Sequence, residues 1–130
     1  MANKYNAKKV VTADGVFDSH NEYRRYQQLR LLERAGKIED LQRQVPFELI
    51  PAQYETYPRY GKRGQRLKDG RRCIEKKCVY VADFVYTDTE KQKVVVEDTK
   101  SEPTKTEAYV IKRKLMLHIH GLRIREVSAC

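Results

Sequence analysis

The sequence predicts a small α/β domain in which helices flank a mixed β-sheet, with the core order α-β-β-β-α-β. Two neighbouring runs, 79–86 and 94–100, are rich in β-branched and aromatic residues, as strands are. The first run carries apolar residues on both of its faces, so both faces of the sheet need a cover. Two segments with helical spacing of apolar residues, one before and one after these runs, supply one helix for each face.

The first helix is expected from Ser19 to Ala35. Ser19 is a suitable N-cap, and Glu22 three residues later completes a capping box. Phe17, just before the cap, is expected to pack on Tyr23. Tyr26, Leu29 and Leu32 are expected to face the core. Gly36 is expected to end the helix.

The remaining core elements follow from the same patterns. Val45, Phe47 and Leu49 alternate with other residues in a strand, and Pro46 places that strand at a sheet edge or a bulge. A second helix is expected from Thr106 to His118, and a short strand follows over 122–127. The apolar stripe predicted for the second helix consists of Ala108, Ile111, Leu115 and Ile119.

Segment 54–77 is predicted to be a flexible basic loop inserted between core strands of a single domain that spans residues 1–130. Three glycines interrupt it, and eight basic residues stand against two acidic ones between residues 61 and 77. A nucleic acid is the favoured contact, with a solvated loop as the alternative. Three tyrosines before the basic run could stack on unpaired bases; they are Tyr54, Tyr57 and Tyr60. The phosphate-binding candidates are Lys62, Arg63, Arg66, Lys68, Arg71, Arg72, Lys76 and Lys77.

Lys105, just before the second helix, and Lys112 and Arg113 within it are further candidates for binding a nucleic-acid backbone, although simple solvation explains them equally well. The formal net charge of +9 across 130 residues favours an anionic partner, above all nucleic acid. No apolar run approaches the length of a membrane span, and no signal-peptide core is found, so we expect a cytoplasmic protein without a membrane partner.

A zinc site is the weaker alternative for this chain. The spacing of Cys73, Cys78, His118 and His120 matches no strong zinc pattern. The odd total of three cysteines argues against a disulfide framework.

Carboxylates interrupt the apolar faces of the two central runs. Alternation puts Asp83 on one face with Val79, Val81 and Val85, and puts Asp98 and Lys100 on one face with Val94 and Val96. Ionised groups on a buried face are unfavourable unless they are paired or bind a metal. Two carboxylates and a lysine on adjacent strands can hold a divalent cation and an attacking water beside a phosphate.

These residues resemble the signature of the PD-(D/E)XK, or restriction-endonuclease-like, nuclease superfamily. Asp83 matches the Asp of the second core strand, and Asp98-Thr99-Lys100 matches the acidic residue, spacer and lysine of the third. Glu22 matches the acidic residue of the first helix. The run from Phe17 to Tyr23 also resembles small phage-encoded members, and Holliday junction resolvases share the layout. Ala82 stands where the superfamily name implies proline.

The resemblance implies a Mg²⁺- or Mn²⁺-dependent endodeoxyribonuclease encoded by a phage or prophage and acting in the bacterial cytoplasm. The implied metal ligands are Asp83, Asp98, the backbone carbonyl of Thr99, and Glu22, which is otherwise explained by the capping box. Lys100 would orient the attacking water. DNA is the expected substrate, RNA is not excluded, and branched substrates would favour a homodimer. The alternatives are an inactive nucleic-acid-binding module and a phage adaptor protein on the same fold.

Overall fold

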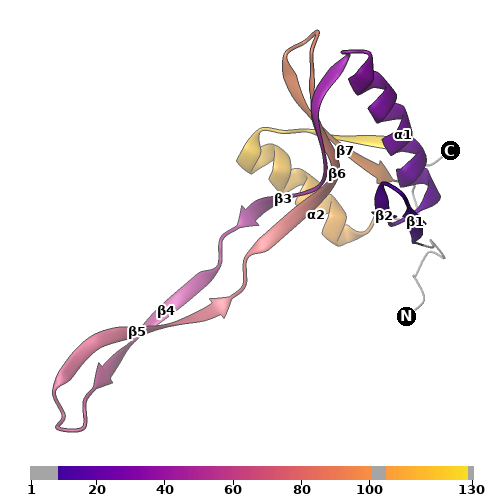
Figure 1. Ribbon diagram of the computed structural model, residues 1–130. Coiled ribbons are helices and arrows are strands. Elements are labelled where there is room, and N and C mark those ends of the chain that lie inside the picture. Colours follow the sequence, from indigo (N-terminus) through magenta and orange to yellow (C-terminus); the bar gives the residue numbers. More distant parts are fainter. Residues whose placement is uncertain (1–8, 101–104, 129–130) are drawn as a thin grey trace.

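The computed structural model describes residues 9–100 and 105–128, apart from the side chains of Lys100 and Ser128. This part of the chain forms a mixed α/β fold with two α-helices and eight strands in three sheets, which confirms the predicted class. Neither helix of the described residues is long and apolar enough to cross a membrane. In chain order (Figure 1), the elements are β1 (Val10–Thr12), β2 (Gly15–Phe17), α1 (His20–Arg34), β3 (Ile38–Ile50), β4 (Gln53–Tyr60), β5 (Arg66–Glu75), β6 (Cys78–Asp88), β7 (Lys93–Lys100), α2 (Glu107–Leu115), the π-helical turn η2 (Met116–His120) and β8 (Ile124–Ser128).

The central sheet has four strands in the order β3-β6-β7-β8. Strands β3, β6 and β7 are antiparallel neighbours, whereas β7 and β8 are parallel. Parallel strands need a long crossover connection, and α2 supplies it here. As predicted from Pro46, β3 is an edge strand, where a residue without an N–H is tolerated.

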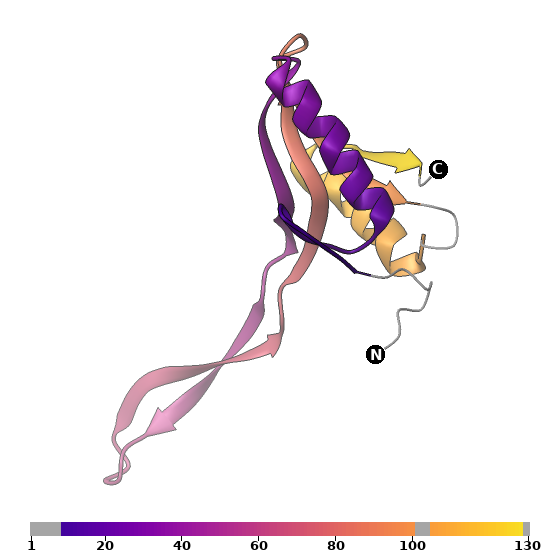
Figure 2. The ribbon, with the colours of Figure 1, turned by 45° about the vertical axis from the view of Figure 1, so that its right-hand side comes forward.

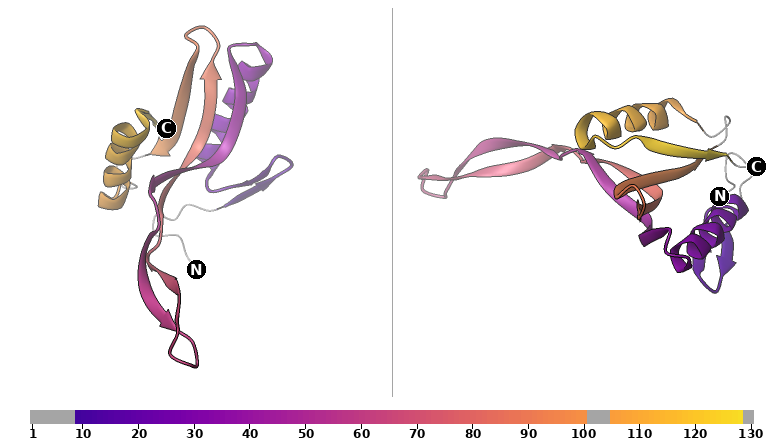
Figure 3. Two further views of the ribbon diagram at one scale, coloured as in Figure 1. Left: turned by 90° about the vertical axis from the view of Figure 1, so that its left-hand side faces the viewer. Right: turned by 90° about the horizontal axis from the view of Figure 1, so that it is seen from above.

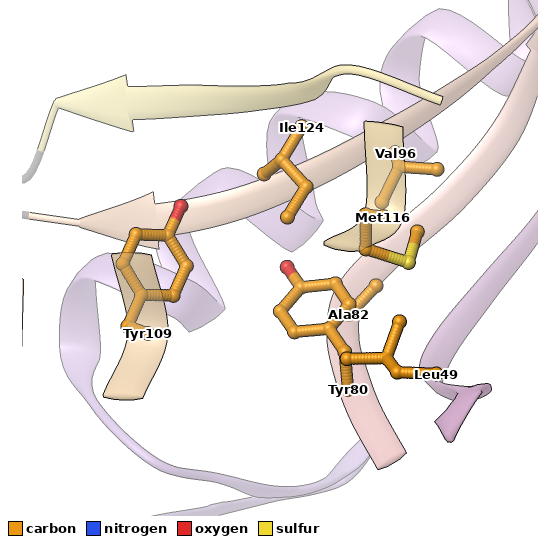
Figure 4. Packing of buried hydrophobic residues seen from close by; sticks show 7 residues of the cluster. All are labelled: Leu49, Tyr80, Ala82, Val96, Tyr109, Met116 and Ile124. Carbon is orange, nitrogen blue, oxygen red and sulfur yellow. The ribbon is translucent and has the colours of Figure 1, made fainter. Parts of the chain in front are cut away.

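One helix covers each face of this sheet (Figure 3, right). On the α1 side, Tyr26 and Leu29 pack with Phe84 and other buried residues. On the α2 side, a second cluster gathers side chains from six elements (Figure 4). Its buried members are Leu49, Tyr80, Ala82, Val96, Tyr109, Met116 and Ile124. The expectation of a sheet covered on both sides is therefore confirmed.

The sequence signals predicted for the two ends of α1 are present in the structure. The Ser19 side chain accepts a hydrogen bond from a backbone N–H in the first turn, as expected of an N-cap. The ring centroids of Phe17 and Tyr23 lie 4.8 Å apart, as the predicted staple requires. Gly36 follows the helix with a φ of 76°, a left-handed conformation that suits glycine. The predicted core position of Leu32 is wrong, because this side chain is 37% exposed.

The stripe predicted for α2 is also largely wrong. The buried residues of this segment are Tyr109 and Met116, whereas Ile111 is 57% and Ile119 is 44% exposed. Ala108 is exposed as well, and only Leu115 of the predicted stripe packs against the core. The hydroxyl of Tyr109 bonds to Glu126 of β8, which fixes the rotation of the helix. The helix then widens into η2, so strict helical spacing fails beyond Leu115.

The predicted basic loop is instead a β-ribbon. Strands β4 and β5 pair antiparallel from Gln53 opposite Glu75 to Tyr60 opposite Arg66. The ribbon extends away from the central sheet, beyond β3 and β6 (Figure 1). The sequence does not indicate these strands, because no apolar face alternates along them and glycines interrupt the run.

Strand β6 changes face at Asp83, contrary to strict alternation. Tyr80 and Ala82 pack on the α2 side, whereas Phe84 and Tyr86 pack on the α1 side. The change coincides with an irregularity in β3, where Gln44 has a positive φ of 51°. Asp83 therefore lies where the strand crosses from one layer of the core to the other, which lets it meet groups from both layers.

Candidate active site

Asp83 and Asp98 lie on the two central strands of the sheet, β6 and β7. The register pairs Phe84 with Glu97, so Asp83 and Asp98 follow as neighbours one residue further along. The backbone N–H of Thr99 donates to Asp83 Oδ2 at 2.8 Å. Asp98 is only 4% exposed. The structure thus brings together the two carboxylates that the sequence singles out.

The close pairing of these acids changes their electrostatics. Burial, and then the charge of Asp98, raise the pKa of Asp83 to about 8, and the charge of Glu22 adds to the rise. The hydrogen bond from the N–H of Thr99 opposes the rise. A buried and a half-buried carboxylate so close together repel each other, and a shared proton or a bound cation would relieve that repulsion.

Tyr80 holds one oxygen of Asp98. Its hydroxyl donates to Asp98 Oδ2 at 2.5 Å inside the α2-side cluster. Burial and the charge of Asp98 raise the pKa of Tyr80 far above its usual value, so the phenol stays protonated and remains a donor. The Tyr80 ring centroid lies 6.5 Å from that of Tyr109. Asp98 is therefore oriented by a rigid, packed partner.

Glu22 is both a capping residue and a neighbour of the aspartates. Its backbone N–H donates to Ser19 Oγ at 3.1 Å. Its carboxylate accepts from the N–H of Asp18 at 3.1 Å and from the Gln44 side chain at 2.8 Å. Glu22 is 2% exposed, and burial is the main cause of its raised pKa. Both of its oxygens are thus engaged, while its charge acts on Asp83.

The donor set fits a hard divalent cation only in part. No three His, Cys, Asp or Glu side chains within residues 9–99 and 105–127 are grouped so as to hold a metal ion. The structure therefore does not bring Glu22 to the aspartates as a third ligand. Asp83, half-buried, and Asp98, buried, carry carboxylate oxygens, the donors that Mg²⁺ prefers. The buried hydroxyl of Thr99, between Asp98 and Lys100, has no hydrogen-bond partner.

Lys100 is the last residue of β7, two positions beyond Asp98. Its backbone pairs with Ser128 in the parallel ladder. Its side chain lies outside the described part of the structure.

Glu97, the acidic neighbour of Asp98, faces the opposite layer. Arg25 of α1 donates to both of its oxygens, each at 2.8 Å, and the Tyr86 hydroxyl donates to it as well. The side-chain bond to Glu97 also raises the pKa of Arg25. Glu97 is fully buried and fully paired. Its oxygens are bound by Arg25 and Tyr86, so Asp98 is the acid of β7 that lies beside Asp83.

Two of the three basic residues predicted at the second helix have a structural partner. Lys105 and Arg113 contact Glu126 at 3.4 Å and 3.0 Å. Burial acts to raise the pKa of Glu126, but hydrogen bonds from Tyr109, Arg113 and Lys105 hold it below its usual value. These contacts fasten α2 to β8 beside Asp98, which pairs with Glu126 in the sheet register. Lys112 is half-buried.

The eight basic candidates of the predicted loop lie along the ribbon. Two occupy the turn between its strands, four lie on β5, and two follow β5. They are Lys62 and Arg63, then Arg66, Lys68, Arg71 and Arg72, then Lys76 and Lys77. All eight are exposed.

The four residues considered for zinc have separate surroundings in the structure. His120 bonds through Nε2 to the carbonyl oxygen of Glu48 at 2.7 Å, with its ring edge against Phe47. Cys73 is exposed on the ribbon, and Cys78 begins β6. His118 is exposed on η2.

Two residues of the site could not be identified from the sequence. Tyr80 resembles an ordinary strand aromatic, and its polar tip on a buried face is the only sequence signal of a partner. Gln44 resembles an exposed strand residue, and nothing in the sequence indicates its positive φ or its bond to Glu22.

Comparison with known proteins gives a family but no described activity. No curated protein matches the chain, and no solved structure matches it. One family model, described as "Protein of unknown function (DUF1064)", matches residues 2–128. That match covers nearly the whole chain. The protein therefore belongs to the DUF1064 family.

Proposed function

We propose that this protein is a metal-dependent endonuclease that hydrolyses phosphodiester bonds in DNA of a phage or mobile element, including branched recombination intermediates. The observation that carries the proposal is the meeting of Asp83 and Asp98 on adjacent central strands, one half-buried and one buried, where a bound cation would relieve their repulsion.

The arrangement of elements supports the same proposal. Apart from the β4–β5 ribbon, which comes between β3 and β6, the order is that of the PD-(D/E)XK nuclease core: helix α1, strands β3, β6 and β7, helix α2 and strand β8. In this proposal the two acids correspond to the signature of that restriction-endonuclease-like fold, and they lie on β6 and β7, the two inner strands of the sheet.

In this proposal Asp83 and Asp98 hold Mg²⁺ or Mn²⁺, together with the backbone carbonyl of Thr99. When bound, the cation supplies a water of lowered pKa and neutralises charge on the scissile phosphate. Tyr80 keeps Asp98 in one orientation through its hydrogen bond. Glu22 acts at a distance, through its charge and through water. Lys100 orients the attacking water and stabilises the charge that develops on the phosphate.

A cleavage panel tests this proposal. Supercoiled plasmid, linear duplex, single strand, four-way junction and RNA would each be offered with Mg²⁺, Mn²⁺ or chelator. We expect metal-dependent products that disappear in Lys100→Ala, with binding retained. Cleavage by Lys100→Ala equal to that of the wild type would refute the assignment of Lys100.

A second candidate, an inactive nucleic-acid-binding module, is favoured by one observation. The carboxylate of Glu22 is engaged by Asp18 and Gln44, so only two acids remain for a cation. Binding of nucleic acid without products for any metal would support this module over the nuclease.

A further inference from the structure

The β4–β5 ribbon contributes almost nothing to the core. All residues of β4 are exposed, and on β5 only Gly70 is buried and Leu67 half-buried. The ribbon points away from the helices and the central sheet in every view (Figures 1 and 2). An isolated two-stranded ribbon is only marginally stable in water. Both of its faces and its tip are therefore surfaces open to a partner.

The charge of the ribbon suits a polyanion. Residues 53–77 hold nine basic and three acidic residues, so they carry +6 of the chain's net charge of +9. The other residues share only +3. Such a concentration on one projecting element matches the phosphate backbone of a nucleic acid.

Arginines of the ribbon are held in place by aromatic rings. The guanidinium carbon of Arg71 lies 3.8 Å from the ring centroid of Tyr54, and that of Arg72 lies 5.0 Å from that of Tyr57. Arg72 also pairs with Glu55 at 2.5 Å. Arg71 and Arg72 are successive strand residues, so they point to opposite faces. Each face of the ribbon thus carries an oriented guanidinium.

The same contacts oppose the expectation that the tyrosines stack on unpaired bases. A Cβ atom added to Gly70 would lie 2.2 Å from the Tyr57 ring, so that ring packs directly on the backbone of β5. Arg72 lies over the same ring. Tyr57 is therefore used within the ribbon, and Arg66 in turn lies 5.6 Å from the centroid of Tyr60.

We infer that the β4–β5 ribbon enters the major groove of double-stranded DNA. The major groove of B-form DNA is about 12 Å wide and about 8.5 Å deep, and it admits a two-stranded ribbon. The ten residues of β5 span about 30 Å, close to one turn of the duplex. Cations at the tip (Lys62, Arg63) and at the base (Lys76, Lys77) then reach phosphates at both ends, while Arg71 or Arg72 reaches base edges.

This inference rests on the proposed function for its choice of DNA. The geometry of the groove also favours a DNA duplex over an RNA duplex. The major groove of A-form RNA is deep and too narrow for side chains to read. Single strands have no groove and would need open aromatic faces. A ribbon whose three tyrosine rings each lie beside an arginine, and which presents oriented guanidinium groups, fits duplex DNA better than either.

Binding measured in chelator, where no cleavage takes place, tests the inference. The probes are a labelled DNA duplex of about 20 base pairs, two helical turns, the same sequence as single strand, and the matching RNA duplex. We expect the DNA duplex to bind at least about tenfold more tightly than either other probe. Methyl green, which occupies the major groove, should displace the protein, whereas netropsin in the minor groove should not.

Two matched double variants test whether the ribbon is the part of the protein that binds the duplex. Arg71→Gln with Arg72→Gln should weaken duplex binding about tenfold or more, with little change in the salt slope, because the phosphate contacts at the tip and the base remain. Lys91→Gln with Lys93→Gln removes the same charge at the β6–β7 turn and should change the affinity by less than about threefold. The four residues are exposed and lie outside both core clusters, so circular dichroism should show the central sheet and helices folded in both variants.

Equal effects of the two variants, displacement by netropsin alone, or equal affinity for single-stranded DNA or RNA duplex would overturn the groove assignment. The binding assay contains no metal, so its result does not depend on cleavage. A protein that binds as expected here but gives no products in the cleavage panel would refute the proposed nuclease and leave this inference standing.

Discussion

Tyr80 donates its hydroxyl hydrogen to Asp98 across 2.5 Å, and this bond joins the α2-side core to the candidate active site. Tyr80 is 3% exposed and Asp98 is 4% exposed, so water does not compete for the bond. The phenol holds one carboxylate oxygen of Asp98, whose charge acts on Asp83. A core side chain thereby orients one acid of the candidate site.

Removing that hydroxyl should weaken metal binding. Tyr80→Phe keeps the ring, and we expect it to reduce Mn²⁺ affinity about tenfold, as is typical when a partner of a metal ligand is lost. Calorimetric titration of Mn²⁺ into the two proteins measures the effect. The unfolding free energy should fall by about 1–3 kcal/mol.

The matched control for this change is Tyr86→Phe. Tyr86 also donates to a buried carboxylate, that of Glu97, but on the other face of the sheet. It should lose similar stability and keep its Mn²⁺ affinity. Equal losses of affinity in both variants would mean that Tyr80 has no special relation to the metal site.

The metal-free protein should lose stability as the pH rises. The pKa of Asp83 is raised to about 8 in the folded protein, mainly by burial and by Asp98. Between its ordinary value and about 8, the folded state holds a proton that the unfolded state lacks, so its contribution to stability is present at low pH and is lost on raising the pH. Urea unfolding between pH 5 and 8 measures this trend.

Asp83→Asn should flatten the trend relative to the wild type, because the amide does not titrate. Mg²⁺ should restore stability to the wild type at the upper end of that range and have little effect on Asp83→Asn. A wild type that becomes more stable than Asp83→Asn as the pH rises without metal would show that the carboxyl pair is not repulsive.

The Arg25–Glu97 pair should be important for stability and unimportant for chemistry. Arg25→Met leaves a carboxylate buried without its bidentate partner, and we expect it to cost about 3–5 kcal/mol of unfolding free energy. Adding Glu97→Gln should recover much of that loss, since no unpaired charge remains. Chemical denaturation of the single and double variants measures both values, and a double variant less stable than Arg25→Met would contradict the charge-pair account.

The sequence predicts those parts of the fold that have local causes. The cap at Ser19, the contact between Phe17 and Tyr23, and the glycine after α1 each depend on residues close together in the chain. The pairing of Asp83 with Asp98 was also predictable, since two strands joined by a short turn must be neighbours.

Features with tertiary causes were not predictable. The ribbon is held by Tyr–Arg contacts and backbone pairing rather than by a buried apolar face, so hydrophobic periodicity does not indicate it. The rotation of α2 depends on the bond between Tyr109 and Glu126. The change of face at Asp83 accompanies the left-handed conformation of Gln44, for which a glutamine gives no signal.

The central claim is that Asp83 and Asp98 carry out metal-dependent hydrolysis, and plasmid nicking by three Asp→Asn variants tests it most directly. Asp83→Asn and Asp98→Asn change the site, whereas Asp88→Asn makes the same substitution at the far end of β6, where the side chain caps the next turn. We predict Mg²⁺-dependent nicking by the wild type and by Asp88→Asn, with a loss of about 100-fold or more in the other two. Nicking by Asp83→Asn or Asp98→Asn at the wild-type rate, with all proteins folded, would contradict the account.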